Sequence, residues 1–367
     1  MVYNTNIEPL QYMINQNIFS KNKLAQTERA ESIRRYLLNE VKAGKSHFIR
    51  RAAAAFNVSR QTIFDNLKAL VEKGYLSSQG ITRARTYKMG PKRRHSVVLP
   101  LKGLEESAVY YEEFGFIFSD LNPEIQKICD FGFTEMLNNA IDHSGGKEVK
   151  VIVIRDEKSV LICIDDNGEG IFNHIARIFH LSDPRESILE LSKGKLTTDP
   201  NNHSGQGIFF TSRVFDSFFI DSGDLMFTHL DGEKNDFLLH NGKESSAGTR
   251  VWMEITLDST KNLRAVFDSF TGSEEESFAF NKTVVPVKLA LYEGERLVSR
   301  SQAKRILHRI DKFKSVVLDF KGVDMIGQAF ADEVFRIFAR KNPTVELIPI
   351  NESDDVRKTI ISARSTH

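Results

Sequence analysis

Hydrophobic residues near the N-terminus recur at helical spacing in successive segments. Apolar positions three and four residues apart predict helices over residues 27–44, 48–56 and 60–73. Apolar and polar residues then alternate over residues 81–89, after a turn at Gln79-Gly80, which predicts a β-hairpin. Residues 1–26 have no such period. The pattern therefore predicts an N-terminal arm, followed over residues 27–95 by three helices and a hairpin.

A longer helix is predicted from Pro123 to His143. Its apolar stripe includes Met136, Leu137, Ala140 and Ile141. On a different face, Glu135, Asn139 and His143 stand four residues apart. Four residues advance a helix by about 40° and about 6 Å, so these side chains form one polar row. The row offers a carboxylate for proton transfer, an amide oxygen for a hard cation and an imidazole for a phosphate. The alternative interpretation is an ordinary amphipathic helix with a solvated side.

Two glycine-rich motifs follow this helix. Alternating residues over 148–155 and 159–165 predict a hairpin, which leads into the D-x-G-x-G pattern from Asp166 to Gly170. Farther along, Ser204-Gly205-Gln206-Gly207 opens a predicted helix over residues 208–214. Free N–H groups and the positive end of the helix dipole meet at such a start, which favours an anion.

The C-terminal third alternates between strand-like and helix-like segments. Strands are predicted over residues 283–292, 315–320 and 345–350, and helices over residues 299–313 and 328–340. This alternation predicts a small α/β domain with a mixed sheet over residues 282–367. Residues 259–281 are less regular, include an acidic run, and are predicted to be a linker.

Composition and charge narrow the functional classes. The chain has 367 residues and two cysteines, Cys129 and Cys163, both in apolar surroundings, which excludes a disulfide scaffold and favours buried thiols in a reducing cytoplasm. The sequence has no apolar run of the roughly 18 residues that indicate a membrane span, so no membrane association is expected. Residues 1–95 carry 18 Lys and Arg against 6 Asp and Glu. A basic head on an otherwise acidic chain predicts a polyanionic partner for the head.

The motifs of residues 100–258 resemble, in their order and spacing, the GHKL superfamily of ATP-binding domains. Members include type II topoisomerases, heat-shock chaperone ATPases, mismatch-repair MutL, sensor histidine kinases and anti-sigma-factor serine kinases. The resemblance implies a Bergerat α/β sandwich that binds ATP and Mg²⁺. By this resemblance Asn139 holds the Mg²⁺, and Glu135 is the general base for water in hydrolysing members.

The resemblance also implies which residues contact the nucleotide. The adenine would be held by Asp166, Gly168, Gly170 and Thr249, the last at the start of a late strand. The phosphates would be held by His143, Lys193, Lys195, Ser204, Gly205, Gln206 and Gly207. For Lys193 and Lys195, a solvated loop is the alternative.

The sequence AFNVSRQTIFDNLKALVEKGYL within the basic head resembles the helix-turn-helix of bacterial regulators. With the hairpin it implies a winged helix-turn-helix that binds double-stranded DNA through residues 27–95. Candidate DNA contacts are Arg60, Gln61, Thr62 and Asn66 on the third helix, and Arg83, Arg85 and Lys88 on the wing. A basic, protein-binding winged helix is the alternative.

The sequence VVLDFKGVDMIGQAFADEVFRIF resembles STAS domains, some of which pair with GHKL serine kinases. Those partners carry a phosphorylatable Ser or Thr in the turn after the strand. The corresponding turn here, Met325 to Phe330, has no hydroxyl. A phosphotransfer from the ATP site to this domain is therefore not expected, and a packing, dimerising or ligand-binding role is favoured.

Together these features predict a multidomain α+β protein: a winged helix-turn-helix, a GHKL α/β sandwich and a small STAS-like α/β domain. The leading hypothesis is a cytoplasmic, homodimeric, DNA-binding regulator that ATP·Mg²⁺ switches, with slow hydrolysis. One alternative is a protein kinase of the anti-sigma-factor type that acts on a separate partner. Another is a nucleotide-sensing component of a stress or defence assembly, and the STAS-like domain could contact a protein partner in any of these.

Overall fold

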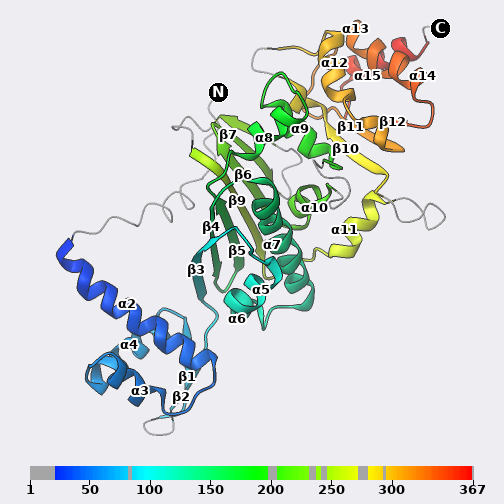
Figure 1. The fold of residues 1–367 in the computed structure, drawn as a ribbon. Coiled ribbons are helices and arrows are strands. Elements are labelled where there is room, and N and C mark those ends of the chain that lie inside the picture. The colour runs from blue at the N-terminus through cyan, green and yellow to red at the C-terminus, as the bar shows by residue number, and fades with distance from the viewer. Residues whose placement is uncertain are drawn as a thin grey trace. The chain divides into compact units, whose positions relative to one another are not determined.

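The protein divides into two compact units, Met1–Arg93 and Arg94–His367. The computed structural model describes residues 21–81, 85–196, 205–230, 237–240, 246–271, 280–291 and 295–365 (Figure 1). The boundary falls inside the Pro-, Lys- and Arg-containing stretch that ends the basic head of the sequence.

The described part of the N-terminal unit contains three helices and a two-stranded antiparallel hairpin. These are α2 (Lys21–Lys42), α3 (Phe48–Ala55), α4 (Arg60–Glu72), β1 (Leu76–Gln79) and β2 (Thr86–Met89). Ser59 caps α4, because its hydroxyl oxygen accepts a hydrogen bond from the backbone N–H of Thr62 at 3.0 Å. The core is a small apolar cluster formed by Ile33, Leu37, Ala52, Ile63, Leu67, Leu70 and Leu76. Three helices and a hairpin were predicted, although α2 starts earlier than expected.

A seven-stranded sheet, counted over the described residues, organises the second unit (Figure 1). Its strands, in spatial order, are β3 (Arg93–Pro100), β4 (Glu148–Arg155), β5 (Ser159–Asp166), β9 (Ser246–Thr256), β6 (Ser217–Gly223), β7 (Leu225–Leu230) and β8 (Phe237–His240). From β4 to β8 in this order, each strand pairs with its neighbour in the antiparallel direction. The alternating burial along β4 places Val149, Val151 and Val153 on the covered face.

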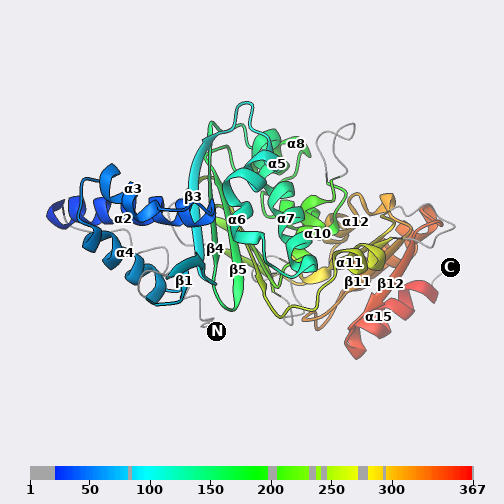
Figure 2. The ribbon, with the colours of Figure 1, turned by 90° about the horizontal axis from the view of Figure 1, so that it is seen from below.

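Helices gather on one face of this sheet (Figure 2). They are α5 (Glu106–Ala108), the π-helical η2 (Val109–Phe114), α6 (Gly115–Phe118), α7 (Pro123–His143), α8 (Ile171–Ile178), α9 (Glu186–Lys193), α10 (Gly207–Val214) and α11 (Leu263–Phe270). The long helix α7 begins at a cap, where the side chain of Asn122 accepts from the N–H of Glu124 at 2.9 Å. A Cβ added to Gly132, in the middle of α7, would lie 2.3 Å from the ring of Phe215. This glycine therefore lets α7 and the end of α10 pack closely.

The segment predicted to be a linker, residues 259–281, contains α11. Asn262 caps this helix by accepting from the N–H of Ala265 at 2.9 Å. The ring of Phe267 stacks on that of Phe210, with centroids 4.0 Å apart. The segment is thus partly packed against α10, because its aromatic residues lie on one face of a helix.

The C-terminal domain is built on three strands, β10 (Lys282–Pro286), β11 (Ser315–Asp319) and β12 (Glu346–Ile350). The described elements around them are the 3₁₀ turns η4 (Val287–Ala290) and η5 (Ile310–Lys312), helices α12 (Arg300–Leu307), α13 (Gln328–Ala331), α14 (Ala339–Lys341) and α15 (Asp354–Ser365), and the π-helical η6 (Asp332–Phe338). Both strand pairs are parallel, so the prediction of a mixed sheet was wrong. Helical crossovers between successive strands bring each strand back in the same direction.

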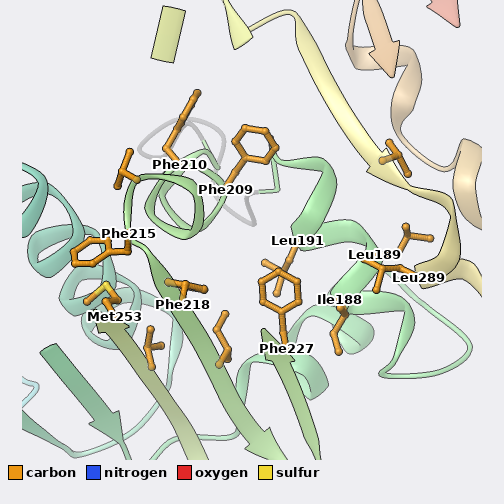
Figure 3. Close-up of a cluster of buried hydrophobic side chains, with 14 of the residues drawn as sticks. Ile188, Leu189, Leu191, Phe209, Phe210, Phe215, Phe218, Phe227, Met253 and Leu289 are labelled. Carbon is orange, nitrogen blue, oxygen red and sulfur yellow. The ribbon is translucent and has the colours of Figure 1, made fainter. Parts of the chain in front are cut away.

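One apolar core connects the seven-stranded sheet, its helices and the C-terminal domain. Figure 3 shows Phe209 and Phe210 from α10, Phe227 from β7, Leu189 from α9 and Leu289 from η4 in this cluster. The sheet and the C-terminal domain therefore share one apolar core within the second unit.

Both cysteines are free and buried, as expected from their apolar neighbours. Burial raises the pKa of the Cys163 thiol to about 12, so the thiol stays protonated near neutral pH. Within the part of the chain that the structure describes, no helix combines the length and apolarity needed to cross a membrane.

Candidate functional site

A cavity of about 380 Å³ lies among α7, α8, α10 and the ends of strands β5 and β9. Its volume falls within the range of about 300–1,000 Å³ typical of small-molecule sites. The residues from the sequence motifs that line it are Glu135, Asn139, His143, Asp166, Gly170, Gly205, Gly207 and Thr249. Apolar side chains complete the wall: Met136, Ile164, Ile171, Ile175, Leu191, Leu196, Ile208 and Val251. The structure thus brings the three separate motifs to one cavity.

The Asp166 carboxylate is fixed at the end of β5. Its Oδ1 accepts from the backbone N–H groups of Gly168, at 2.8 Å, and Thr249, at 3.3 Å. Burial raises the pKa of Asp166, and the two backbone N–H groups oppose part of that rise. A Cβ added to Gly248 would lie 1.9 Å from the carbonyl oxygen of Asp166, so β9 approaches this loop as closely as glycine allows. The backbone thus holds Oδ1, and the Asp166 side chain lines the cavity.

Thr249 and Gly170 position the helix that follows the glycine loop. The Thr249 hydroxyl oxygen accepts from the N–H of Ile171, the first residue of α8, at 2.9 Å. Gly170 has a φ of 88°, a backbone conformation that residues other than glycine rarely adopt. Gly168 does not line the cavity, but a Cβ there would lie 2.1 Å from the carbonyl oxygen of Ser144. Gly168 thus allows the loop to pack on the end of α7.

Glu135 lies against the N-terminus of α10. A Cβ added to Gly207 would lie 2.1 Å from Glu135 Oε2. Gly205, with a φ of 67°, turns the chain before the helix, and its carbonyl accepts from the N–H of Leu196 at 3.0 Å. The helix end thus faces both the cavity and a carboxylate, so an anion bound there would share the positive dipole end with Glu135. Gln206 is the N-cap residue and makes no side-chain capping bond; Ser204 lies outside the described residues.

The sequence patterns did not identify His174 as a residue of the cavity. His174, on α8, lines the cavity, and the centroid of its ring lies 6.4 Å from that of His143. Its Nδ1 is hydrogen-bonded to Glu169, which also accepts from Arg177 at 2.7 Å. The hydrogen bonds from Arg177 and His174 lower the pKa of Glu169. His174 lies one helical turn after Gly170, and this spacing was the feature of the sequence that could have identified it.

The two lysines predicted to contact phosphates do not line the cavity. Lys193 is 1% exposed, and its ammonium donates to Glu190 at 2.6 Å, to the Arg305 carbonyl at 3.0 Å and to the His308 carbonyl at 2.9 Å. Burial lowers the pKa of Lys193, opposed by the charge of Glu190. This ammonium thus anchors α9 on the C-terminal domain.

Lys195 makes the same kind of contact. Its ammonium donates to the Lys312 carbonyl at 2.8 Å and lies 4.6 Å from the centroid of the Phe313 ring. Burial, together with the nearby charge of Lys312, lowers the pKa of Lys195. In this structure both ammonium groups therefore contact the C-terminal domain and not the cavity.

In the N-terminal unit, the predicted DNA-contact residues differ in exposure. Arg60, Gln61, Arg85 and Lys88 are exposed, and Thr62 is half-buried with its hydroxyl 3.0 Å from that of Ser59. Asn66 is buried: its amide donates to the Thr62 carbonyl at 2.8 Å and accepts from Arg34 at 3.1 Å. Asn66 thus supports the packing of α2 on α4 and does not present a surface for base recognition. Arg83 lies outside the described residues.

The comparison with known families concerns the C-terminal domain. Residues 302–357 match a STAS-like domain of unknown function (DUF4325). This match confirms the expected STAS-like character of the domain. The match runs from α12 into α15, and β10, before it, completes the three-stranded sheet. No curated protein matches the chain.

Proposed function

We propose that this chain is a DNA-binding regulator whose cavity binds ATP with Mg²⁺, and that the bound nucleotide switches its conformation. The observation that carries the proposal is the convergence of Asn139, Asp166 and Gly207 on one cavity, from three motifs far apart in the sequence. Under this proposal, residues 100–258 form a GHKL-type domain, and residues 27–95 form a winged helix-turn-helix.

The residues of the cavity fit a nucleotide and its metal. The Asp166 carboxylate offers Oδ2 to an amino group such as that of adenine, at a buried position beside apolar Ile164 and Val251. The Asn139 amide oxygen is a hard ligand of the kind Mg²⁺ prefers. Glycine at position 207 leaves room for the Glu135 carboxylate beside the start of α10, whose backbone N–H groups would favour an anion in the cavity. A bound Mg²⁺ would neutralise phosphate charge there.

Glu135 is the residue proposed to activate water. Its carboxylate lies on the cavity wall beside the start of α10, where a terminal phosphate would be held. A carboxylate within reach of an attacking water can take its proton. Slow hydrolysis would then reset the switch.

The segment between α9 and the glycine turn supports a switching role. Leu191 and Leu196 line the cavity, while Lys193 and Lys195, between them, donate to carbonyls of the STAS-like domain. A ligand that moves this segment also moves its anchors. A nucleotide that binds one arrangement more tightly shifts the population toward it.

The N-terminal unit supplies the proposed DNA contacts. The exposed Arg60 and Gln61 lie in the first turn of α4. Residues 1–95 together contain 18 Lys and Arg and only 6 Asp and Glu. Such a charge excess favours the phosphate backbone.

A gel-shift assay on genomic DNA fragments, with and without ATP·Mg²⁺, tests the proposal. The expected result is DNA binding whose strength changes when nucleotide is added. The Asn139→Ala variant is the matched control: it should keep the nucleotide-free DNA affinity and lose the nucleotide effect. Absence of DNA binding in both states would contradict the proposed regulator.

A protein kinase that acts on a separate partner is the alternative candidate. The pairing of the cavity with a STAS-like domain is the observation that favours it. Incubation of the chain with γ-labelled ATP and candidate partner proteins distinguishes the two, because only a kinase transfers label to protein.

A further inference from the structure

His174 has one polar atom with no partner in the described structure. The side chain lines the cavity, and its Nδ1 is hydrogen-bonded to Glu169. Its Nε2 is buried and has no hydrogen-bond partner among the described residues. Buried polar atoms are normally paired, so an unpaired one in a side chain that lines a cavity indicates a missing partner.

Neighbouring residues fix the orientation of the His174 ring. Glu169 accepts from Arg177 at 2.7 Å and also contacts Nδ1, and Arg177 itself lies 3.3 Å from Nδ1. A carboxylate at Nδ1 makes that nitrogen the donor, which leaves Nε2 as the ring nitrogen without a partner among the described residues. The backbone of His174 is also held in place, since its N–H donates to the Gly170 carbonyl at 3.0 Å.

We propose that His174 is a ligand-contacting residue whose Nε2 donates a hydrogen bond to a phosphate oxygen of the bound nucleotide. This inference rests on the nucleotide function proposed above. With Nδ1 bound to a carboxylate, protonation of Nε2 makes the ring a donor at both nitrogens, and a phosphate stabilises that form. The ring of His143, whose centroid lies 6.4 Å from that of His174, lines the same part of the cavity.

A metal ion is a poorer candidate for this position. Among the described residues, no group of three or more His, Cys, Asp or Glu side chains is placed to hold a metal. Mg²⁺, the ion that accompanies ATP, prefers oxygen ligands to imidazole. The phosphate is the nucleotide group that accepts hydrogen bonds most strongly.

The test compares the affinities for ATP and for adenosine by titration calorimetry on the full chain. His174→Ala should weaken ATP binding about tenfold or more, the usual effect of a charge-assisted hydrogen bond. Adenosine, which has no phosphate, should bind His174→Ala as it binds the parent chain. His174→Gln, which can place a donor near the same point, should recover part of the ATP affinity.

The control variant is His180→Asn. His180 is exposed, follows the same helix and has a φ of 52°, which asparagine tolerates. This variant should bind ATP and adenosine as the parent chain does. Equal weakening of ATP and adenosine by His174→Ala, or no weakening of ATP, would overturn the inference while leaving the proposed function standing. Failure of the parent chain itself to bind ATP would overturn both.

Discussion

Replacing Glu190 with glutamine removes the negative charge at the centre of a buried basic cluster. Glu190 is 2% exposed on α9, and its carboxylate contacts Lys193 at 2.6 Å, His308 at 3.0 Å and Arg309 at 3.0 Å. His308 and Arg309 belong to the STAS-like domain, so the carboxylate joins α9 to that domain. Glutamine has nearly the same shape and lacks the charge.

The expected loss of stability follows from the charges left behind. Removing one partner of a buried ion pair costs about 3–5 kcal/mol, because the other charge remains desolvated and unpaired. Lys193 also donates to two carbonyls, and Arg309 donates to the Lys195 carbonyl. These remaining hydrogen bonds place the expected loss of stability at the lower end of that range. At about 2–4 °C per kcal/mol for a domain of this general size, a loss of about 3 kcal/mol lowers Tm by roughly 6–12 °C.

Differential scanning calorimetry on the full chain measures this difference. The control is Asp355→Asn, which removes a carboxylate 3.6 Å from Lys358 where both side chains are more than three-quarters exposed. Exposed pairs contribute about 0–1 kcal/mol, so this variant should melt close to the parent chain. A Glu190→Gln variant that melts within the error of the Asp355→Asn variant would refute the buried cluster as a stabilising contact.

The pH dependence of the difference gives a second readout. Burial would raise the pKa of Glu190, but the charge of Lys193 and the hydrogen bond from His308 outweigh it and lower the pKa from 4.5 to about 2. A lowered folded-state pKa means that the carboxylate stabilises the fold above pH 4.5 and that this contribution disappears as the pH falls toward 2. The Tm difference between parent and Glu190→Gln should therefore shrink over that acidic range.

Four further substitutions test the proposed site and DNA surface. Gly207→Ala places a Cβ 2.1 Å from Glu135 Oε2, so the carboxylate must move. ATP turnover, measured by phosphate release, should fall about tenfold or more. The Tm, measured by calorimetry, should change little. Asp166→Asn replaces the acceptor with an amide, and competition binding should show a smaller preference for ATP over GTP; an unchanged preference would argue against the adenine contact. Arg60→Ala and Arg85→Ala should each reduce the slope of log affinity against log salt by about 1 in DNA titrations, and an unchanged slope would indicate that these side chains do not contact phosphates.

Local patterns in the sequence were sufficient to place the polar row of α7 and the glycine motifs. Glu135, Asn139 and His143 share a wall of the cavity because helical spacing alone fixes which side chains lie on one face. Gly170 and Gly205 adopt positive φ, which the glycines themselves signalled. The three helices and the hairpin of the N-terminal unit followed from the same local physics.

Long-range packing was beyond the reach of these patterns. Lys193 and Lys195 lie in a basic segment whose sequence predicts a flexible loop. Both nevertheless contact carbonyls that lie 112 to 117 residues farther along the chain. Asn66 sits in the first half of α4 like the exposed Arg60, but it faces α2. The proposed role of His174 depends on its contact with Glu169 and its place in the cavity, and the sequence pattern shows neither. Partners distant in sequence decide which polar groups are buried.

Titration calorimetry of ATP into the purified chain, with and without Mg²⁺, is the most direct measurement of the nucleotide site. The expected result is saturable binding at one site per chain, weakened at least about tenfold by Asn139→Ala or by removal of Mg²⁺, as the loss of a metal-bridged contact to phosphate implies. No saturable binding to the parent chain, or equal affinity in the Asn139→Ala variant with Mg²⁺ present, would contradict an ATP·Mg²⁺ site in this cavity.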